Sequence, residues 1–487
     1  MITFLSGIAI LILGYVFYGR FIDKRLFGSK SKYPTPAITH TDGVDFSPLK
    51  PWKIFIIQFL NIAGLGPIFG AILGAAYGPV AYIWIALGCV FMGGVHDYFS
   101  GMLSVRHNGR SMPNIISKYL SRPLFILMNI FMVWLLISIG SSFIVGPAEL
   151  ITSLTGTPKH IWIIVILAYY IIATILPIDE IIGHLYPFFG GVLLFMAIAV
   201  GSIMLVKCLH GELTLIELSK DSFRNFHNDP EHNILVPMLF IILSCGALSG
   251  FHSTQSPIMA RCISDEKYGR SVFYGAMICE GIVAMIWATA AMAYFGGPDG
   301  LNAAAAAGKT PAIIVNEICN SWLGKFGALI AIIGVIICPI TSGDTAFRSL
   351  RLILGEAFKV DQNKISFRLM TALPIFLLAG FICKLDFSTI WIYNGIGNQI
   401  LAMFVLWTGA KYLSKQGAKH LFLSIPATFI TFICISYFLC APHKVGGLMV
   451  DPLISYIIAG AITLIAFSTF NAYVLRRQKS LLIKRRG

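Results

Sequence analysis

The chain has 487 residues, of which 57% are hydrophobic and 12% charged, and its mean hydropathy is +0.80. Because soluble domains carry about 25% charged residues, this composition excludes an ordinary water-soluble globule. The net charge of +14 comes from Lys and Arg between apolar segments, as in membrane proteins, and does not indicate nucleic acid. The 10 cysteines form no CxxC pair, which predicts neither a disulfide framework nor a zinc site.

Apolar segments of about 20 residues, the length that crosses a bilayer as a helix, recur along the whole chain. The first, residues 3–20, has no small-residue cleavage site after it and is expected to be a span rather than a signal peptide. Twelve more spans are expected at 53–76, 79–103, 124–146, 161–177, 187–207, 234–252, 271–295, 326–344, 367–383, 388–410, 421–440 and 452–474. The expected fold class is an all-α polytopic membrane protein with one transmembrane domain, residues 1–487.

Basic residues concentrate in alternate loops. Lys and Arg recur in residues 20–32, 106–122, 261–270, 348–368 and 411–419 and in the tail 476–486, whereas most intervening loops are poor in them. Positive loops face the cytoplasm. The chain is therefore expected in a bacterial-type inner membrane, surrounded by lipid, with its N-terminus outside and its C-terminus in the cytoplasm. The hydrophilic stretches 21–52, 208–233 and 296–325 are expected to be loops with at most a short helix each.

Two of these spans contain helix breakers. The second is interrupted by Gly64-Leu65-Gly66-Pro67 and the seventh by a Gly- and Ser-rich run ending at Thr254. Glycines also serve close helix packing, but non-helical backbone in a membrane has to be buried or line a cavity, where it can bind ions or carboxylates. The candidate substrate-binding residues are Asn61, Gly64, Gly66, Pro67, Ser249, Gly250, His252 and Ser253.

The interrupted spans are five apart in the chain, which gives them opposite orientations in the membrane. Matching interruptions in two halves are typical of a five-plus-five inverted repeat. We expect spans 2–6 (residues 53–207) and 7–11 (234–410) to be the repeats. Residues 1–20 and 421–474 would then be peripheral helices.

Ionisable residues inside spans are rare and usually functional. His96 and Asp97 lie in span 3, where they either couple transport to protons or anchor the helix end. Glu280 lies well inside span 8 and either carries a proton or hydrogen-bonds a neighbouring helix. Asp344 ends span 9 and can pair with Arg348 four residues on.

Hydroxyl groups lie one turn deeper in span 9. Thr341 and Ser342 offer the hard oxygen ligands that Na⁺ prefers, and Asp344 is the alternative proton carrier. His252 is expected to be a hydrogen-bonding pore residue rather than a metal ligand, because no second ligand lies at useful spacing. No metal and no cofactor other than the coupling H⁺ or Na⁺ is expected. Asn394 and Asn398 are expected to make structural hydrogen bonds.

Several motifs resemble those of the carbon starvation protein A (CstA) family of peptide and pyruvate transporters. The matching runs are Pro34-Thr35-Pro36-Ala37, Thr41-Asp42-Gly43-Val44-Asp45-Phe46, Ile62-Ala63-Gly64-Leu65-Gly66-Pro67-Ile68, Gly94-Val95-His96-Asp97, Ser104-Val105-Arg106-His107-Asn108-Gly109, Ser244-Cys245-Gly246-Ala247-Leu248-Ser249-Gly250-Phe251-His252 and Phe273-Tyr274-Gly275-Ala276-Met277. The resemblance runs from about residue 30 to 290 and weakly beyond.

The resemblance implies a leucine-transporter-like (LeuT-like) fold whose breaks in spans 2 and 7 line the substrate site. It also implies a cation site formed by Thr341 and Ser342 against the span 2 backbone near Ala63 and Gly66. Where family members carry a His-His pair before the first break, this chain has Ile57-Gln58, which leaves the substrate and the coupling ion open.

The predicted function is secondary active import of a small organic nutrient by alternating access. The substrate would be a peptide, with amino acids and pyruvate as alternatives, and its carboxylate would bind half-helix amide ends. The alternatives are an ion channel, which would need a filter loop or symmetric pore units, and a membrane sensor, which would show no flux. A membrane-embedded enzyme would need a nucleophile and a base that face each other. Neighbours on a helix such as His252 and Ser253 do not face each other, so no catalytic residue is expected. The oligomeric state stays open.

Overall fold

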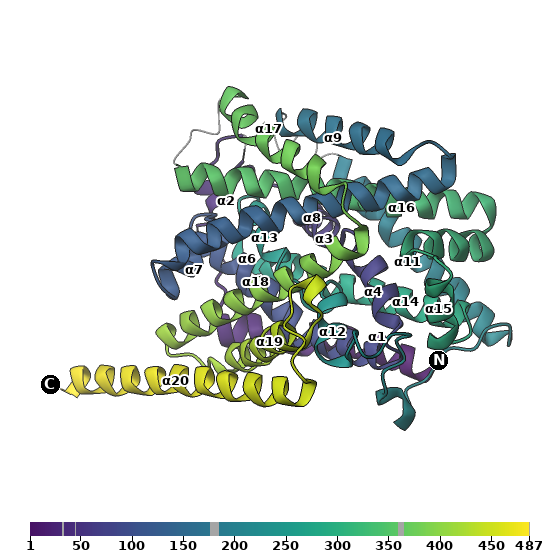
Figure 1. Ribbon diagram of the computed structural model, residues 1–487. Helices are drawn as coiled ribbons and strands as arrows, with labels where there is room; N and C mark the ends of the chain where they lie inside the picture. The colour runs from purple at the N-terminus through teal and green to yellow at the C-terminus, as the bar shows by residue number, and fades with distance from the viewer. Residues whose placement is uncertain (32–33, 44, 176–184, 359–364, 487) are drawn as a thin grey trace.

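The computed structural model describes residues 1–31, 34–43, 45–175, 185–358 and 365–486, and all regular structure in these ranges is helical (Figure 1). The end of expected span 161–177 and parts of basic loops 20–32 and 348–368 lie outside the described residues. The α-helices are α1 (Ile2–Leu13), α2 (Pro36–Thr39), α3 (Pro51–Ala63), α4 (Ala71–Ala75), α5 (Val80–Ile83), α6 (Gly94–Arg106), α7 (Met112–Tyr119), α8 (Leu124–Thr155), α9 (Lys159–Ile175), α11 (Leu185–Leu209), α12 (Leu235–Ile242), α13 (His252–Ala260), α14 (Ala276–Tyr294), α15 (Pro298–Ala306), α16 (Pro311–Phe358), α17 (Ile365–Ile382), α18 (Phe387–Gln416), α19 (Leu421–Cys440) and α20 (Pro452–Arg486).

Short π- and 3₁₀-helical segments join several of these into longer rods. They are η1 (Gly14–Gly19), η2 (Ile22–Phe27), η3 (Gly66–Gly70), η4 (Trp84–Gly93), η5 (Lys220–Phe223), η6 (Glu266–Tyr268), η7 (Arg270–Gly275) and η8 (His443–Val445). Over the described residues, nine helices are long and apolar enough to cross a membrane, and the bent pair α3 and η3–α4 makes a tenth span. The expectation of a polytopic helical membrane protein is confirmed.

The three other expected spans are shorter helices. α9 and α17 cover spans 5 and 10, and α12 covers the first half of span 7. Two sequence expectations need correction. Span 7 does not end at residue 252 but resumes there as α13 and runs to Ala260. Residues 296–325 are not mainly loop, because α15 and the first turns of α16 occupy them.

The break in span 2, residues 64–65, has a clear backbone cause. Gly64 has φ +46°, which residues with a Cβ rarely adopt, and a Cβ there would lie 2.6 Å from the Phe143 ring. Pro67 lacks the amide hydrogen that would continue the α3 ladder. The helix axis consequently turns by 53° between α3 and the η3–α4 rod.

The break in span 7, residues 243–251, is longer and lies against the break in span 2. Gly246 has φ +90°, and the helix resumes only at His252. A Cβ added to Gly66 would lie only 1.9 Å from the Cβ of Cys245, so the two interrupted segments touch at a position where only glycine fits. Both expected interruptions are confirmed.

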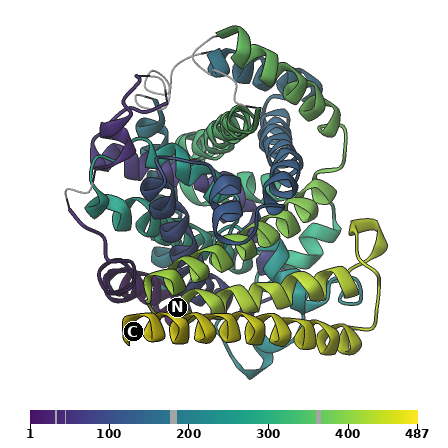
Figure 2. The ribbon, with the colours of Figure 1, turned by 90° about the vertical axis from the view of Figure 1, so that its left-hand side faces the viewer.

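Burial separates central helices from peripheral ones. The measure is the share of residues that are buried within the most apolar stretch of each span. This share is 89% for the span that contains α14, 22% for the span that contains α1 and 17% for α20. α20 lies along one outer edge of the bundle and α17 along the opposite edge (Figures 1 and 2). The exposed apolar side chains of α1 and α20 are those that lipid would cover. The division into inverted repeats stays a prediction.

Candidate functional site

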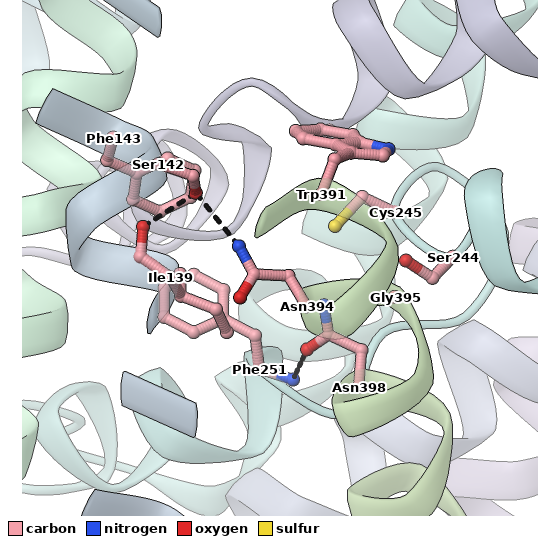
Figure 3. Close-up of a pocket in the computed structure, with 11 residues that line it drawn as sticks. Ile139, Ser142, Phe143, Ser244, Cys245, Phe251, Trp391, Asn394, Gly395 and Asn398 are labelled. Atoms are coloured by element: carbon pink, nitrogen blue, oxygen red, sulfur yellow. Dashed lines mark hydrogen bonds between the residues drawn. The ribbon is translucent and has the colours of Figure 1, made fainter. Parts of the chain in front are cut away.

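A small cavity with about 20 Å³ of free space lies between the two breaks and helices α8 and α18 (Figure 3). Its lining residues are Gly66, Ile139, Ser142, Phe143, Ser244, Cys245, Phe251, Trp391, Asn394, Gly395 and Asn398. The walls are therefore mainly aromatic and aliphatic, with a few amide and hydroxyl groups. This composition is typical of small-molecule sites, which combine apolar walls with a few placed polar groups.

Two asparagines of α18 hold the cavity wall. The Asn398 side-chain carbonyl accepts a hydrogen bond of 2.9 Å from the Phe251 amide, and its backbone carbonyl accepts one of 3.1 Å from the Gly250 amide. The expectation that Asn398 is structural fits these contacts. Asn394 donates to the Ser142 hydroxyl over 3.1 Å, as drawn in Figure 3. Its buried carbonyl oxygen has no hydrogen-bond partner in the described part of the chain.

A second polar group runs through the protein behind the cavity. His96 Nδ1–H donates to one oxygen of Asp97 over 2.8 Å, and His252 Nδ1–H donates to the other over 2.9 Å. His252 Nε2 then lies 3.3 Å from an oxygen of Glu280. We refer to His96, Asp97, His252 and Glu280 as the polar chain. It joins α6, α13 and α14, and all four side chains are fully buried.

The polar chain is attached to the break in span 7. The second carboxylate oxygen of Glu280 accepts a 3.0 Å hydrogen bond from the Gly246 amide. His252 is the first residue of α13, directly after the same break. A change of charge at Glu280 or His252 therefore acts directly on the backbone of this break, which also forms one wall of the cavity. His96 and Asp97 belong to this buried group and not to an exposed helix end.

Thr341, Ser342 and Asp344 lie in a different place, on α16. Ser342 donates to the Leu60 carbonyl over 2.9 Å, and Thr341 donates to the Cys338 carbonyl of its own helix over 2.8 Å. The resemblance placed the span 2 partner at Ala63 and Gly66, whereas the Ser342 hydroxyl contacts a carbonyl about one turn earlier. Asp344 accepts a 2.7 Å hydrogen bond from the Tyr186 hydroxyl of α11.

The remaining candidates at the breaks are buried but differ in their contacts. Asn61 and Gln58, one turn apart on α3, are fully buried, and neither amide has a hydrogen-bond partner among the described residues. Ser249 receives a weak hydrogen bond of 3.5 Å from the Cys245 thiol. Ser253 donates to the Gly250 carbonyl over 2.7 Å, so its hydroxyl does not form a nucleophile–base pair with His252.

The first amides of the α13 half-helix are bonded within their own segment in this conformation. The backbone amides of His252, Ser253 and Thr254 donate hydrogen bonds to carbonyls one turn earlier. The acceptors are Ser249, Gly250 and Phe251, at 3.3, 3.0 and 2.8 Å. The expectation that a substrate carboxylate binds half-helix amide ends stays a prediction.

The sequence did not single out Trp391, Phe143 or Ser142 as cavity residues. Nothing in the sequence around Phe143 or Trp391 distinguishes them from other aromatic residues in spans. Cys245 was not among the expected site residues, yet its side chain is part of the cavity wall. The spacing of Asn394 and Asn398 on one helix face was a usable signal, because two amides facing the same side of a span need partners.

Two interrupted helices packed around a small cavity, with a buried titratable group behind them, define a secondary transporter. The chain belongs to the carbon starvation family: the family model described as carbon starvation protein CstA matches residues 1–148 and 126–328. The resemblance found in the motifs is therefore confirmed.

Relatives extend the match over most of the chain. An uncharacterised membrane protein of Haemophilus influenzae is 42% identical over 63% of this chain and 95% of its own length. The peptide transporter CstA of Campylobacter jejuni is 25% identical over 87% of this chain and 78% of its own length. The pyruvate/proton symporter BtsT of Escherichia coli is 22% identical over 59% of this chain and 48% of its own length.

Solved structures show the fold. The crystal structure of MhsT in complex with L-phenylalanine matches with a TM-score of 0.53 at 14% identity, over 85% of this chain and 98% of that one. Mhp1, a nucleobase-cation-symport-1 family transporter, matches with a TM-score of 0.52 at 14% identity, over 89% of this chain and 94% of that one. The leucine-transporter-like fold is confirmed, and the channel alternative finds no support in these relatives.

Proposed function

We propose that this transporter imports small peptides together with protons by alternating access. The substrate would bind in the cavity between the two breaks, and the polar chain would carry the coupling proton. The observation that carries the proposal is the uninterrupted contact from His96 through Asp97 and His252 to Glu280, whose far carboxylate oxygen receives the Gly246 amide.

The polar chain suits a proton better than a sodium ion as the coupling ion. Imidazole and carboxylate groups are the side chains that relay protons inside membranes. Here the His252 imidazole lies between the carboxylates of Asp97 and Glu280. Gain or loss of one proton changes the net charge of this group next to the break in span 7. Because the buried group is shielded from water, that change is strong enough to favour one arrangement of the break over another.

The substrate class is supported by the cavity and by the names of relatives. In this conformation the free space inside the cavity is about 20 Å³, which holds about one water molecule, so the segments around it have to separate before a dipeptide, an amino acid or pyruvate can bind. The Asn394 carbonyl, without a partner among described residues, can accept a hydrogen bond from a substrate amine or amide. One relative is named a peptide transporter and another a pyruvate/proton symporter. We place peptides first because the match to the peptide transporter covers 87% of this chain, whereas the match to the pyruvate/proton symporter covers 59%.

Sodium coupling is the second candidate, and it has a separate location. The Ser342 hydroxyl and the Leu60 carbonyl, 2.9 Å apart, are oxygen ligands from the two helices that the resemblance assigns to a cation site. In the present arrangement the hydroxyl donates its hydrogen to the carbonyl, which an ion would have to displace. Asp344 would then balance the charge. Ser342→Ala would abolish sodium-driven uptake and leave proton-driven uptake nearly unchanged.

The proposal also includes the orientation and the absence of catalysis. Alternate basic loops put the N-terminus outside and the C-terminus in the cytoplasm of an inner membrane. Ser253 is committed to Gly250, and we assign no catalytic residue.

The test is uptake by the purified protein in liposomes, with labelled dipeptide, alanine and pyruvate under imposed H⁺ or Na⁺ gradients. Dipeptide accumulation that follows an inward proton gradient and collapses with a protonophore is the expected result. Accumulation that follows only the sodium gradient would transfer coupling to Ser342 and Asp344. No accumulation under any gradient, with folded protein, would refute the transport proposal in favour of a sensor.

A further inference from the structure

A cluster of three potential metal ligands lies where the polar chain reaches the cavity. The Cys245 thiol, an imidazole nitrogen of His252 and a carboxylate oxygen of Glu280 all lie within 4.8 Å of one another. No sequence pattern indicates this cluster, because the three residues lie in the break of span 7, in α13 and in α14. They come together only because the break folds back against the middle of α14.

We propose that Cys245, His252 and Glu280 form a binding site for a divalent cation of the zinc class. His252 Nε2 and Glu280 Oε2 are fully buried, lie 3.3 Å apart, and have no hydrogen-bond partner in the described part of the chain. Tetrahedral zinc with bonds of about 2.0–2.1 Å to nitrogen and oxygen would separate these two atoms by about 3.3–3.4 Å. The observed spacing therefore already matches that of two ligands on one zinc ion.

The outer contacts of the cluster are those of a metal site. Asp97 accepts the Nδ1–H of His252, which fixes the tautomer and leaves Nε2 free to coordinate, as in the carboxylate–histidine–zinc arrangement. The Gly246 amide holds the other oxygen of Glu280. Both contacts orient ligands without occupying the coordinating atoms.

The donor set and its surroundings select the kind of cation. One thiolate, one imidazole and one carboxylate suit zinc or another borderline-to-soft divalent ion, and suit Mg²⁺ and Ca²⁺ poorly, since these take oxygen ligands. Three protein ligands leave a fourth position open. Cys245 is also part of the cavity wall (Figure 3), so an ion in the cavity could reach the site without crossing the protein core.

The experiment measures binding and does not depend on transport. Purified full-length protein, stripped of metal, is titrated with Zn²⁺ against a chromophoric chelator and with Cd²⁺ while the ultraviolet absorption of a cadmium–thiolate bond is recorded. We expect one equivalent to bind and the thiolate absorption to appear. Cys245→Ser should abolish the absorption and weaken Zn²⁺ binding at least tenfold. Asp97→Asn, which alters only the outer contact, should weaken binding about 10- to 100-fold.

The matched control is Cys279→Ser, which removes a partly buried cysteine next to Glu280 in the chain but outside the cluster. It should leave both signals unchanged. Wild-type protein that shows no cadmium–thiolate absorption, or Cys245→Ser protein that is folded and binds Zn²⁺ as tightly as the wild type, would overturn the proposal. Either result leaves the proton-coupled transport proposal standing, because uptake is measured on metal-stripped protein, in which His252 and Glu280 are free to carry the proton.

Discussion

Glu280 on α14 and Gly246 in the break of span 7 are joined by a 3.0 Å hydrogen bond from the backbone amide to the carboxylate. The residue that we propose as a carrier of the coupling proton is thus bonded to the segment that forms the cavity wall. Protonation of the carboxylate would weaken this contact, because hydrogen bonds to a charged acceptor are stronger than those to a neutral one. In the proposed mechanism this contact is a direct physical route from proton binding to a change at the substrate cavity.

Glu280→Gln should therefore uncouple uptake from the proton gradient. The amide keeps the size of the side chain but cannot take up a proton, so accumulation in liposomes should fall at least tenfold while membrane insertion is retained. Glu317→Gln removes a partly exposed carboxylate paired with Lys309 and should transport as the wild type does. Gradient-driven accumulation at wild-type rates in Glu280→Gln would remove this residue from the mechanism.

Removing the imidazole between the two buried carboxylates should destabilise the protein. His252→Ala leaves Asp97 and Glu280 buried with their shared partner gone, and breaking a buried ion pair costs about 3–5 kcal/mol. We expect a lower unfolding temperature in detergent. The double variant with Glu280→Gln should recover part of the loss, because one of the two uncompensated charges is gone. Equal unfolding temperatures for wild type and His252→Ala would contradict this account.

Gly66→Ala tests the contact between the two breaks. The added Cβ would lie 1.9 Å from the Cβ of Cys245, so the segments have to separate, and overpacking of this kind costs about 1–3 kcal/mol. Uptake should fall at least tenfold. Gly191→Ala in α11, where a Cβ meets nothing within 4 Å, is the control and should be neutral or slightly stabilising. Similar uptake in both variants would show that the breaks tolerate separation.

Asn394→Ala should weaken substrate binding more than turnover. The variant removes a buried carbonyl that we assign to the substrate, and a lost hydrogen bond of about 1–2 kcal/mol corresponds to roughly a 5- to 30-fold rise in KM. Concentration-dependent uptake of dipeptide measures this rise. Asn320→Ala, an exposed position, should keep the wild-type KM. An unchanged KM in Asn394→Ala would place the substrate elsewhere.

Asp344→Asn separates the two coupling sites. The amide oxygen can still accept the Tyr186 hydroxyl that now bonds the carboxylate over 2.7 Å, but the negative charge is lost. If protons couple through the polar chain, we expect a smaller loss of uptake than in Glu280→Gln. A larger loss, together with dependence on Na⁺, would favour the cation site on α16.

The fold could be predicted from the sequence because its main signals are local. Apolar segments of spanning length and the Gly and Pro interruptions at residues 64–67 and 246–250 are visible without any contact map. The end of span 7 was misjudged because polar residues such as Ser253 look like loop, although a buried partner keeps Ser253 in a helix. Span 9 was likewise expected to end at residue 344, whereas α16 runs to Phe358 and Arg348 donates to the buried Ala173 carbonyl.

The site was predicted only in part, because it depends on contacts between distant segments. His96, Asp97, His252 and Glu280 were each singled out as ionisable residues in spans, but nothing in their spacing shows that Asp97 and His252 meet. The cavity residues Trp391 and Phe143 carry no chemical signal at all. Cys245 lies at the contact between the two breaks because Gly66, which lacks a side chain, lets the two segments touch.

The length of α16 has a mechanical consequence. Its spanning part, Gly327–Phe358, has 32 residues and measures about 48 Å at 1.5 Å per residue, well beyond the hydrocarbon thickness of about 30 Å. An upright rod of this length would project past the bilayer. From Ser342, where α16 touches span 2, to the end of the rod is about 24 Å, so a tilt of about 10° would sweep the tip through roughly 4 Å. A small displacement at the proposed cation site on α16 would thus become, at the membrane surface, a movement large enough to open or close a path for the substrate.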